Sequence, residues 1–511
     1  MEENKKFRNH FSIVFERLGA GFVAFAMIFL YEGAELLGDI GTFLQDIDNL
    51  KDELLVILLI IVAVFTLFAI VLGIQIFRWS KTYISIQEQA IVIEVNTLKR
   101  KKNTIGIKNI SNINLEQNLF EMLMGTYKVK MDTNSMSTAD ATDVKIVLKK
   151  KQAQEFRAQI LGMIAKTEHR YADNKDTVNR KYPENAEIEI YIEEQGSAKG
   201  AGFEQMLIQG IFSMKLISIP LVILSIGGVV FTITEALEAG KTAEGILGVL
   251  SSVFVIGLFG VSMFWDIVKG FIQYYGFRIY RLGDRLHISY GILKKVSYTI
   301  PVDKINALKL VQSPQARIMG MYIAELVNVG MGDDENEAQS FFLLYDKKEK
   351  INERIKMLLP EFADELETEV RMQSAKVWIV WLIPTTIYLL VMSAILGVLN
   401  EFVNEIMLIA VAVAATITVF VMLYVVGNYF TRGYYVGEKT LKLADGNFGK
   451  TILLVKYNKI QYVETKQNFL AKKFGMQKGE IYLLASTRNR MHNIPYFQER
   501  QLEKIRESLL Q

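Results

Sequence analysis

The stretch TIPVDKINALKLVQSPQARIMG, residues 299–320, decides the fold because a recognisable version of it occurs three times in the chain. Three of its residues keep a spacing of seven and then eight positions in every copy. They are Ile110, Gln117 and Gly125 in the first copy, Ile305, Gln312 and Gly320 in the second, and Ile460, Gln467 and Gly475 in the third. Spacing kept without a gap in three copies predicts three repeats of one folded unit.

The sequence of each repeat predicts short antiparallel strands followed by a helix. In the first copy the runs TYISI, AIVIEV and TYKVKM are rich in β-branched residues and alternate in part. A helical insert is expected after the shared glutamine, over Asn118–Met124, and an amphipathic helix over Lys150–Ala165 closes the unit. Several twisted strands capped by a helix describe a small, half-open antiparallel barrel.

Six windows of the chain contain almost no charge over the length of about 20 residues that a helix needs to cross a membrane. They are Leu18–Leu37, Leu54–Phe77, Ile208–Thr234, Ile246–Val268, Val377–Leu399 and Ile406–Val426. The windows come in pairs, and each pair stands just ahead of one repeat. The sequence therefore predicts a membrane α + β protein with six transmembrane helices in three hairpins, each followed by an antiparallel β half-barrel with a C-terminal helix.

This pattern predicts eight segments. They are an N-terminal segment with the first hairpin at 1–77, a first β-domain at 78–166, a linker at 167–202, the second hairpin at 203–270, a second β-domain at 271–360, a linker at 361–376, the third hairpin at 377–427, and a third β-domain at 428–511.

The distribution of basic residues predicts the orientation of the chain in the membrane. Four basic residues precede the first span, whereas the outer turns of the three hairpins contain only Lys51 and Lys241. Basic residues favour the cytoplasmic side, so both termini and all three β-domains are expected there. The tryptophans agree with this orientation because they fall at the predicted inner ends of spans, where the headgroup layer favours them. They are Trp79, Trp265, Trp378 and Trp381.

The sequence offers little for catalysis. It has no cysteine, which excludes disulfides and thiolate chemistry, and its four histidines are far apart and are interpreted as solvated surface residues. They are His10, His169, His287 and His492. The segment DGNFGKT, residues 445–451, is similar to a phosphate-binding loop, but Ala444 stands where the first glycine must be. We expect no catalytic residues, no metal, no cofactor and no nucleic-acid partner, and hence no enzyme.

Two sets of charged residues are candidates for other roles. Lys215 and Asp266 lie at matching depths near the inner ends of neighbouring spans, where they can pair or can each reach the inner interface separately. Lys466, Lys472 and Lys473 flank or lie within the predicted insert NFLAKKFG of the third domain. They are candidates for contact with anionic membrane lipids, but the tendency of basic residues to stay inside also explains them without any lipid specificity, and we favour that explanation.

The pattern best seen in GILKKVSYTIPVDKINALKLVQSPQARIMG, residues 291–320, resembles the bacterial pleckstrin-homology (PH) domain of membrane proteins. Three such domains, each behind a pair of spans, resemble the YdbT group of multi-pass bacterial membrane proteins. The resemblance implies a scaffold in the cell membrane. It also implies self-association or pairing with a smaller PH-domain membrane protein, and a connection with envelope stress or defence against membrane-active peptides. No catalytic residues come with it.

The sequence therefore predicts a non-enzymatic integral membrane scaffold with three cytoplasmic PH-like domains, which bind one another, a companion membrane protein, or both. The alternative is a lipid or peptide transporter that uses the six-helix bundle. Such a transporter would need a polar path between the spans, and Lys215 and Asp266 are the main polar groups that the spans offer.

Overall fold

A computed structural model of the protein describes residues 6–19, 50–87, 89–133, 144–172, 201–212, 242–328, 341–402, 407–485 and 487–499. It also describes residues 226–228, 230, 233–234, 501, 505 and 507. The chain divides into two compact units. One unit contains Met1–Met131 and Asp143–Lys181, and the other contains Asp132–Thr142 and Tyr182–Gln511.

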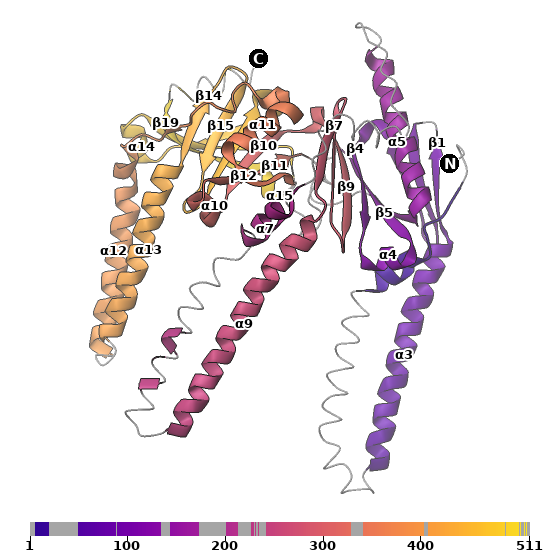
Figure 1. Cartoon of the computed structure of the whole chain (residues 1–511), viewed down its shortest axis with the longest axis horizontal. Helices are drawn as coiled ribbons and strands as arrows, with labels where there is room; N and C mark the ends of the chain where they lie inside the picture. Colours follow the sequence, from indigo (N-terminus) through magenta and orange to yellow (C-terminus); the bar gives the residue numbers. More distant parts are fainter. Residues whose placement is uncertain are drawn as a thin grey trace. The chain divides into compact units, whose positions relative to one another are not determined.

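The first unit contains one β-domain with an N-terminal helix, which covers residues 12–19, and the long helix α3, Leu50–Ser80 (Figure 1). Strands β1 (Thr82–Gln87), β2 (Ala90–Asn96) and β3 (Arg100–Gly106) form an antiparallel sheet. Strands β4 (Ile110–Gln117), β5 (Thr126–Thr133) and β6 (Val144–Lys149) follow, with β5 between the other two. Helix α5, Lys150–Ala172, closes the domain and is longer than predicted. Its Phe156 and Ile160 are fully buried in the core.

The second unit repeats this order of strands twice. The second domain has β7 (Arg278–Leu282), β8 (Arg285–Tyr290), β9 (Lys295–Pro301), β10 (Ala307–Gln312), α10 (Pro314–Ile318), β11 (Met321–Val327), β12 (Phe341–Lys347) and the closing helix α11 (Lys348–Leu358). The third domain has β14 (Gly433–Val436), β15 (Thr440–Asp445), β16 (Lys450–Lys456), β17 (Ile460–Lys466), α14 (Phe469–Lys473), β18 (Met476–Leu483), α15 (Thr487–Arg490) and β19 (Met491–Gln498).

A single sheet joins the second domain to the third. Its strand order is β12-β11-β10-β16-β15-β14-β13, where β13 is the short strand Arg371–Met372 of the segment between the two domains. Strands β10 and β16 pair antiparallel from Ala307 opposite Val455 to Gln312 opposite Lys450. Because both strands carry apolar residues that are buried by this pairing, the cores of the two domains meet across it.

Three helices of the described chain are long and apolar enough to cross a membrane. Their apolar segments are Val253–Tyr274 in α9 (Thr242–Tyr274), Val377–Asn400 in α12 (Val377–Phe402) and Ala410–Thr431 in α13 (Met407–Thr431). Helices α12 and α13 contact each other, and the hydroxyls of Tyr388 and Thr418 lie 3.2 Å apart between them.

The other predicted spans are described only in part. The window Leu54–Phe77 falls within α3, whose shorter apolar segment is Phe65–Ser80. The window Leu18–Leu37 lies almost wholly outside the described residues. In the window Ile208–Thr234, the described part begins with the end of α7, Phe203–Phe212.

Candidate membrane-interface site

The shared glutamine has the same structural role in all three domains. Its side-chain amide donates a hydrogen bond to the backbone carbonyl of the residue nine positions later. The donor–acceptor distances are 2.8 Å from Gln117 to Thr126, 3.0 Å from Gln312 to Met321, and 3.0 Å from Gln467 to Met476. The bond closes the loop that holds the helical insert, which explains why the glutamine keeps its place in every copy.

The shared glycine ends each insert in the left-handed region of backbone conformation. The φ angles are 63° at Gly125, 67° at Gly320 and 62° at Gly475. A Cβ atom added at any of the three would meet nothing within 4 Å. The glycine is therefore required by the backbone angle and not by a lack of space.

Each insert is a short helix with a side-chain cap at its start. Helices α4 (Leu119–Met124), α10 and α14 begin after Asn118, Ser313 and Asn468, whose side chains each accept a hydrogen bond from a backbone N–H in the first turn. The residues that donate are Glu121, Ala316 and Ala471, and all three are buried. The inserts are thus built alike, although their sequences differ.

Each insert packs against a helix at the base of its domain. In the first domain, Phe120 of α4 makes an edge-on contact with Phe15 of the helix at 12–19. In the second, Ala316 of α10 shares an apolar cluster with Phe212 of α7. In the third, Ala471 of α14 shares a cluster with α12. Because α12 is apolar enough to cross a membrane, this packing puts α14 beside the end of a membrane helix.

Each insert also presents at least one large apolar side chain to the outside. Leu123 of α4 is 87% exposed, Ile318 of α10 is 88% exposed, and Phe469 of α14 is 83% exposed. A single exposed apolar residue is ordinary on a protein surface. Its recurrence on the same short element of three domains marks the insert as a surface for apolar contact.

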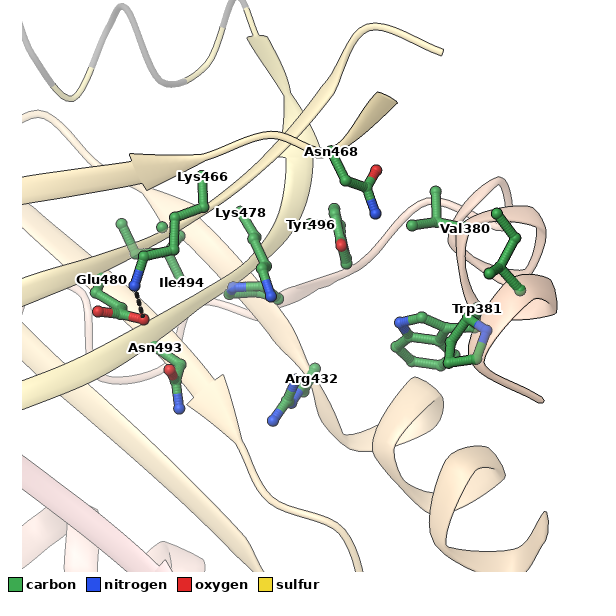
Figure 2. Close-up of a pocket in the computed structure, with 14 residues that line it drawn as sticks. Val380, Trp381, Arg432, Lys466, Asn468, Lys478, Glu480, Asn493, Ile494 and Tyr496 are labelled. Carbon is green, nitrogen blue, oxygen red and sulfur yellow. Dashed lines mark hydrogen bonds and ion pairs between the residues drawn. The ribbon is translucent and has the colours of Figure 1, made fainter. Parts of the chain in front are cut away.

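A cavity of about 380 Å³ lies beside α14 in the third domain (Figure 2). Its apolar wall comes from the first turns of α12, with Val380, Trp381 and Pro384. Because proline has no N–H, Pro384 leaves the backbone carbonyl of Val380 without its helical hydrogen bond at this wall. The opposite wall is basic and includes Lys466 and Lys478. The cavity therefore combines an aromatic residue at a helix end with a basic surface.

The charges around the cavity are only partly compensated. The ammonium group of Lys466 lies 2.9 Å from the carboxylate of Glu480 and 3.4 Å from that of Glu464. The hydrogen bond from Lys466 lowers the pKa of Glu480, and the same bond raises the pKa of Lys466. Lys478 instead lies over the ring of Tyr496, with 6.0 Å between the ammonium nitrogen and the ring centre. Its positive charge faces the cavity (Figure 2).

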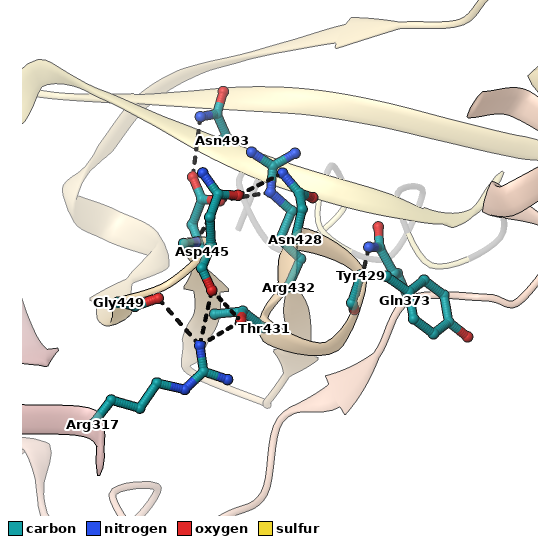
Figure 3. Close-up of polar contacts among 11 residues, drawn as sticks. Arg317, Gln373, Asn428, Tyr429, Thr431, Arg432, Asp445, Gly449 and Asn493 are labelled. Carbon is teal, nitrogen blue, oxygen red and sulfur yellow. Dashed lines mark hydrogen bonds and ion pairs between the residues drawn. The ribbon is translucent and has the colours of Figure 1, made fainter. Parts of the chain in front are cut away.

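A second polar cluster lies where α13 enters the third domain (Figure 3). Arg317 of α10 donates hydrogen bonds to the hydroxyl of Thr431 at 2.7 Å and to the backbone carbonyl of Asn447 at 3.0 Å. Its contacts with the carbonyls of Phe448 and Gly449 are 3.4 Å long. One arginine of the second domain thus holds both the end of α13 and the turn between β15 and β16.

That turn contains the segment DGNFGKT. Asp445 accepts hydrogen bonds from Arg432 at 2.7 Å, from the backbone N–H of Gly446 at 2.8 Å and from Asn493 at 3.2 Å. Gly446 has a φ of 138°, which glycine adopts readily. The turn connects two antiparallel strands, so it is a hairpin and lacks the helix that follows a phosphate-binding loop.

Lys442 of β15 attaches the segment between the second and third domains to the third domain. Its buried ammonium group donates to the backbone carbonyls of Glu365, Leu366 and Thr368 at 3.3, 2.9 and 2.7 Å. Burial lowers the pKa of Lys442 to about 8. The side chain of Glu365 accepts a hydrogen bond from the hydroxyl of Thr440. Burial raises the pKa of Glu365. Together with the pairing of β13 and β14, these contacts hold residues 365–372 of the linker against the third domain.

The charged candidates that the structure describes have different surroundings. Lys472 and Lys473 are exposed on α14, while Lys466 on β17 is held by Glu464 and Glu480. Asp266 is half-buried on α9, and Lys215 lies outside the described residues.

The expectation that the histidines are solvated surface residues holds only in part, because His10, His287 and His492 are all half-buried. Burial lowers the pKa of His492 to about 4, and its Nε2 atom lies 2.9 Å from the carbonyl oxygen of Asn489. The histidine follows the short helix α15 and lies at the start of β19, where it lines a hollow together with Lys309 and Asp445. Its direct neighbours, Met491 and Asn493, are not part of an apolar run, so nothing in the pattern indicated burial.

Three basic residues with contacts in this region could not be identified from the sequence pattern. Arg317, Lys442 and Lys478 are ordinary basic residues in strands or inserts, and their partners are between 18 and 132 residues away. The only available signal was that Lys442 interrupts a strand that is otherwise apolar, since a charged residue in such a place needs buried partners.

Comparison with known proteins assigns the family. A family model described as bacterial PH domain matches residues 35–164, 221–356 and 387–511, which is more than half of the chain. The chain is also similar to the UPF0699 transmembrane protein YdbT of Bacillus subtilis (strain 168), with 22% identity over 439 residues that cover 83% of each protein. No solved structure matches it. The protein is therefore a membrane protein of the bacterial PH domain family, with three copies of that domain.

Proposed function

We propose that this protein is a non-enzymatic membrane scaffold whose six helices, in three hairpins, hold three PH-like domains at the cytoplasmic face. The pairing of β10 with β16 carries the proposal. It fuses the second and third domains through one sheet, so that neither can turn independently of the other. Such an arrangement is suited to presenting binding surfaces in a fixed order.

Contacts with the membrane helices support the same function. Arg317 links the second domain to the end of α13, and Ala471 of α14 packs with Val380 of α12. In the second domain, Gln205 of α7, the short helix that leads into the predicted third span, donates to Asp346 of β12 at 2.7 Å. A domain held at such points cannot leave the membrane surface without breaking buried contacts. The domains would thus act as fixed parts of a membrane assembly.

The inserts are proposed to contact the inner leaflet. Lys472 and Lys473 stand next to the exposed Phe469 on α14, and Lys478 faces the cavity beside Trp381. A basic residue near an anionic leaflet contributes about 1 kcal/mol of attraction. Lys466 contributes less than the others because Glu464 and Glu480 already compensate its charge.

The leaflet contact can be measured on the full chain in nanodiscs that contain a mixture of neutral and anionic phospholipid. We expect Lys472→Gln with Lys473→Gln, and separately Lys478→Gln, to reduce the amount of anionic lipid retained by the purified protein. The matched control is Lys439→Gln, which removes an exposed charge from the β14–β15 turn of the same domain. Equal lipid retention by all variants would contradict the leaflet contact.

The proposed partners are copies of the chain itself, or a smaller membrane protein with one PH domain. Resemblance to the YdbT group supports this, together with a role in envelope stress or in defence against membrane-active peptides. The solubilised full chain is expected to run as a defined oligomer or to co-purify with such a partner. An inert monomer without a partner would contradict the scaffold.

The orientation can be tested because the chain has no cysteine. Lys101→Cys, Lys350→Cys and Lys473→Cys place one thiol in each of the three domains, at exposed positions. A membrane-impermeant maleimide should leave all three unlabelled in intact cells and label them after permeabilisation. Lys241→Cys, in a predicted outer turn, should be labelled in intact cells. Labelling of any domain before permeabilisation would contradict the orientation.

The transporter alternative is favoured by one observation. Asp266 is a half-buried carboxylate within the apolar helix α9, and its proposed partner in the membrane is Lys215. Vesicles reconstituted with the protein that move neither lipid nor peptide would remove this alternative.

A further inference from the structure

Strands β10 and β17 hold equivalent places in the second and third domains but have different surroundings. Counted from the shared glutamine, Ala307 and Leu308 of β10 correspond to Tyr462 and Val463 of β17. Ala307 and Leu308 are fully buried because β16 covers them, whereas Tyr462 is 53% exposed. Within the described chain, β17 forms the outer edge of the sheet β17-β18-β19. The edge that receives a strand in the second domain is thus open in the third.

Strand β3 of the first domain is the counterpart of β16. Counted back from the shared isoleucine, Arg100–Ile105 corresponds to Lys450–Val455. Four residues of β16, from Ile452 to Val455, are buried, whereas β3 is exposed at its first five positions. Among the residues that the structure describes, β3 is an edge of the sheet β1-β2-β3. The first domain therefore has a counterpart of β16, the strand that β10 binds, and this counterpart lies at a sheet edge.

We propose that β17 of one molecule pairs with β3 of a second copy of this chain, in the antiparallel register that β10 and β16 use within the chain. The proposal rests on the scaffold function and names its partner. An open strand edge presents unpaired N–H and C=O groups, and a strand of matching direction satisfies them. The β10–β16 pair is an existing example of this contact between two domains of the same type.

Transferring the β10–β16 register gives a definite set of opposed residues. Tyr462 falls opposite Ile105, Val463 opposite Thr104, and Glu464 opposite Asn103. Thr465 falls opposite Lys102. Aromatic and β-branched residues opposite each other stabilise a strand pair, so the first two pairs favour this register. Strands β17 and β3 are both more polar than β10 and β16, so the two proposed partners match each other in polarity.

One opposed pair disfavours the contact. The same register brings Lys466 opposite Lys101, and like charges opposite each other destabilise a pair of strands. Glu464, on the same face of β17, is the diagonal neighbour of Lys101 and offsets part of this repulsion. The contact is accordingly weaker than the one between β10 and β16. Because the two edges differ, the contact joins molecules head to tail into a ring or a chain.

Crosslinking in membranes tests the register directly. One tagged chain carries Asn103→Cys and a second, differently tagged chain carries Glu464→Cys, in a protein otherwise free of cysteine. Opposed Cβ atoms lie about 4.5–5.5 Å apart, within or just beyond the usual reach of a disulfide, so oxidation should give a dimer that contains both tags. Lys102→Cys with Thr465→Cys should behave in the same way.

The matched control shifts the register by one residue. Thr104→Cys with Glu464→Cys places the two thiols on opposite faces of the sheet, and this pair should give little product. Equal yields from in-register and shifted pairs, or no product from any pair, would overturn the proposal.

Reversing the charge of Lys101 should strengthen the association between the two copies. Lys101→Glu, in the chain with Asn103→Cys, should raise the yield of mixed dimer about fivefold because it replaces repulsion by attraction with Lys466. Adding Lys466→Glu to the other chain should restore the lower yield. Failure of these crosslinks in a protein that still runs as a defined oligomer or co-purifies with a partner would reject the edge contact alone. An inert monomer without a partner would instead reject the scaffold.

Discussion

The guanidinium group of Arg317 lies 2.7 Å from the hydroxyl of Thr431, and this contact attaches the second PH domain to the last residue of a membrane helix. The same side chain binds the turn between the first strands of the third domain. Two domains and one apolar helix therefore meet at a single residue. The strength of that junction can be measured.

Arg317→Ala should lower the free energy of unfolding by about 2 kcal/mol, because it removes hydrogen bonds from a charged donor and leaves backbone carbonyls unpaired. Thermal unfolding of the solubilised full chain measures the change. The control is Arg278→Ala, which removes an exposed arginine from β7 of the same domain. Arg317→Lys should be intermediate, since an ammonium group cannot reach oxygens in several directions at once. A melting temperature unchanged by Arg317→Ala would refute the role of this junction.

The shared glycines should be sensitive to any added side chain. Gly320→Ala and Gly475→Ala should each cost about 1–2 kcal/mol, because alanine is strained in the left-handed region. Asparagine tolerates that region better, so Gly320→Asn should cost less. Gly397→Ala, within helix α12 and with nothing within 4 Å of the added Cβ, is the control and should cost nothing. The same loss at Gly397 and Gly320 would show that the backbone angle is not the cause.

His492 should make the third domain less stable in acid. Its pKa is about 4 in the folded protein and 6.5 in the unfolded chain. As the pH falls from 6.5 towards 4, the unfolded chain binds a proton that the folded protein does not, so the free energy of unfolding decreases. His492→Gln removes this proton uptake. The difference in melting temperature between wild type and His492→Gln should therefore change between pH 7 and pH 5, and a constant difference would exclude His492 as the source.

Lys442 should hold the linker on the third domain. Lys442→Met leaves three backbone carbonyls without their donor, at an expected cost of about 2 kcal/mol. Limited proteolysis should then cut within residues 363–372 faster than in the wild type. Lys439→Met, at an exposed position three residues earlier, is the control.

The pKa of Lys442 adds a pH test of the same contact. Its pKa of about 8 lies below the ordinary value of 10.5, so the unfolded chain holds a proton that the folded protein has lost between these two values. The wild type should therefore gain stability relative to Lys442→Met as the pH rises from about 8 to 10.5. A stability difference that stays constant over this range would contradict the burial of a charged Lys442.

The sequence by itself determined the repeat and its local structure. The three glutamines, the three glycines and the spacing between them are local features, because each acts on backbone within about ten residues of itself. The apolar windows are local as well, since the length of an uncharged run depends on nothing outside it. For these reasons the family and the three β-domains could be predicted before any coordinates were known.

Only the tertiary structure decided how the repeats are joined. Among the described residues, strand β10 is covered by β16 whereas β17 lies at the edge of its sheet, although their places in the repeat are the same. The partners of Arg317 and Lys442 lie 74 to 132 residues away along the chain, and no pattern in the sequence connects them. Pairing between distant strands depends on where whole domains pack, and that is settled by the sum of many contacts and not by any short stretch of residues.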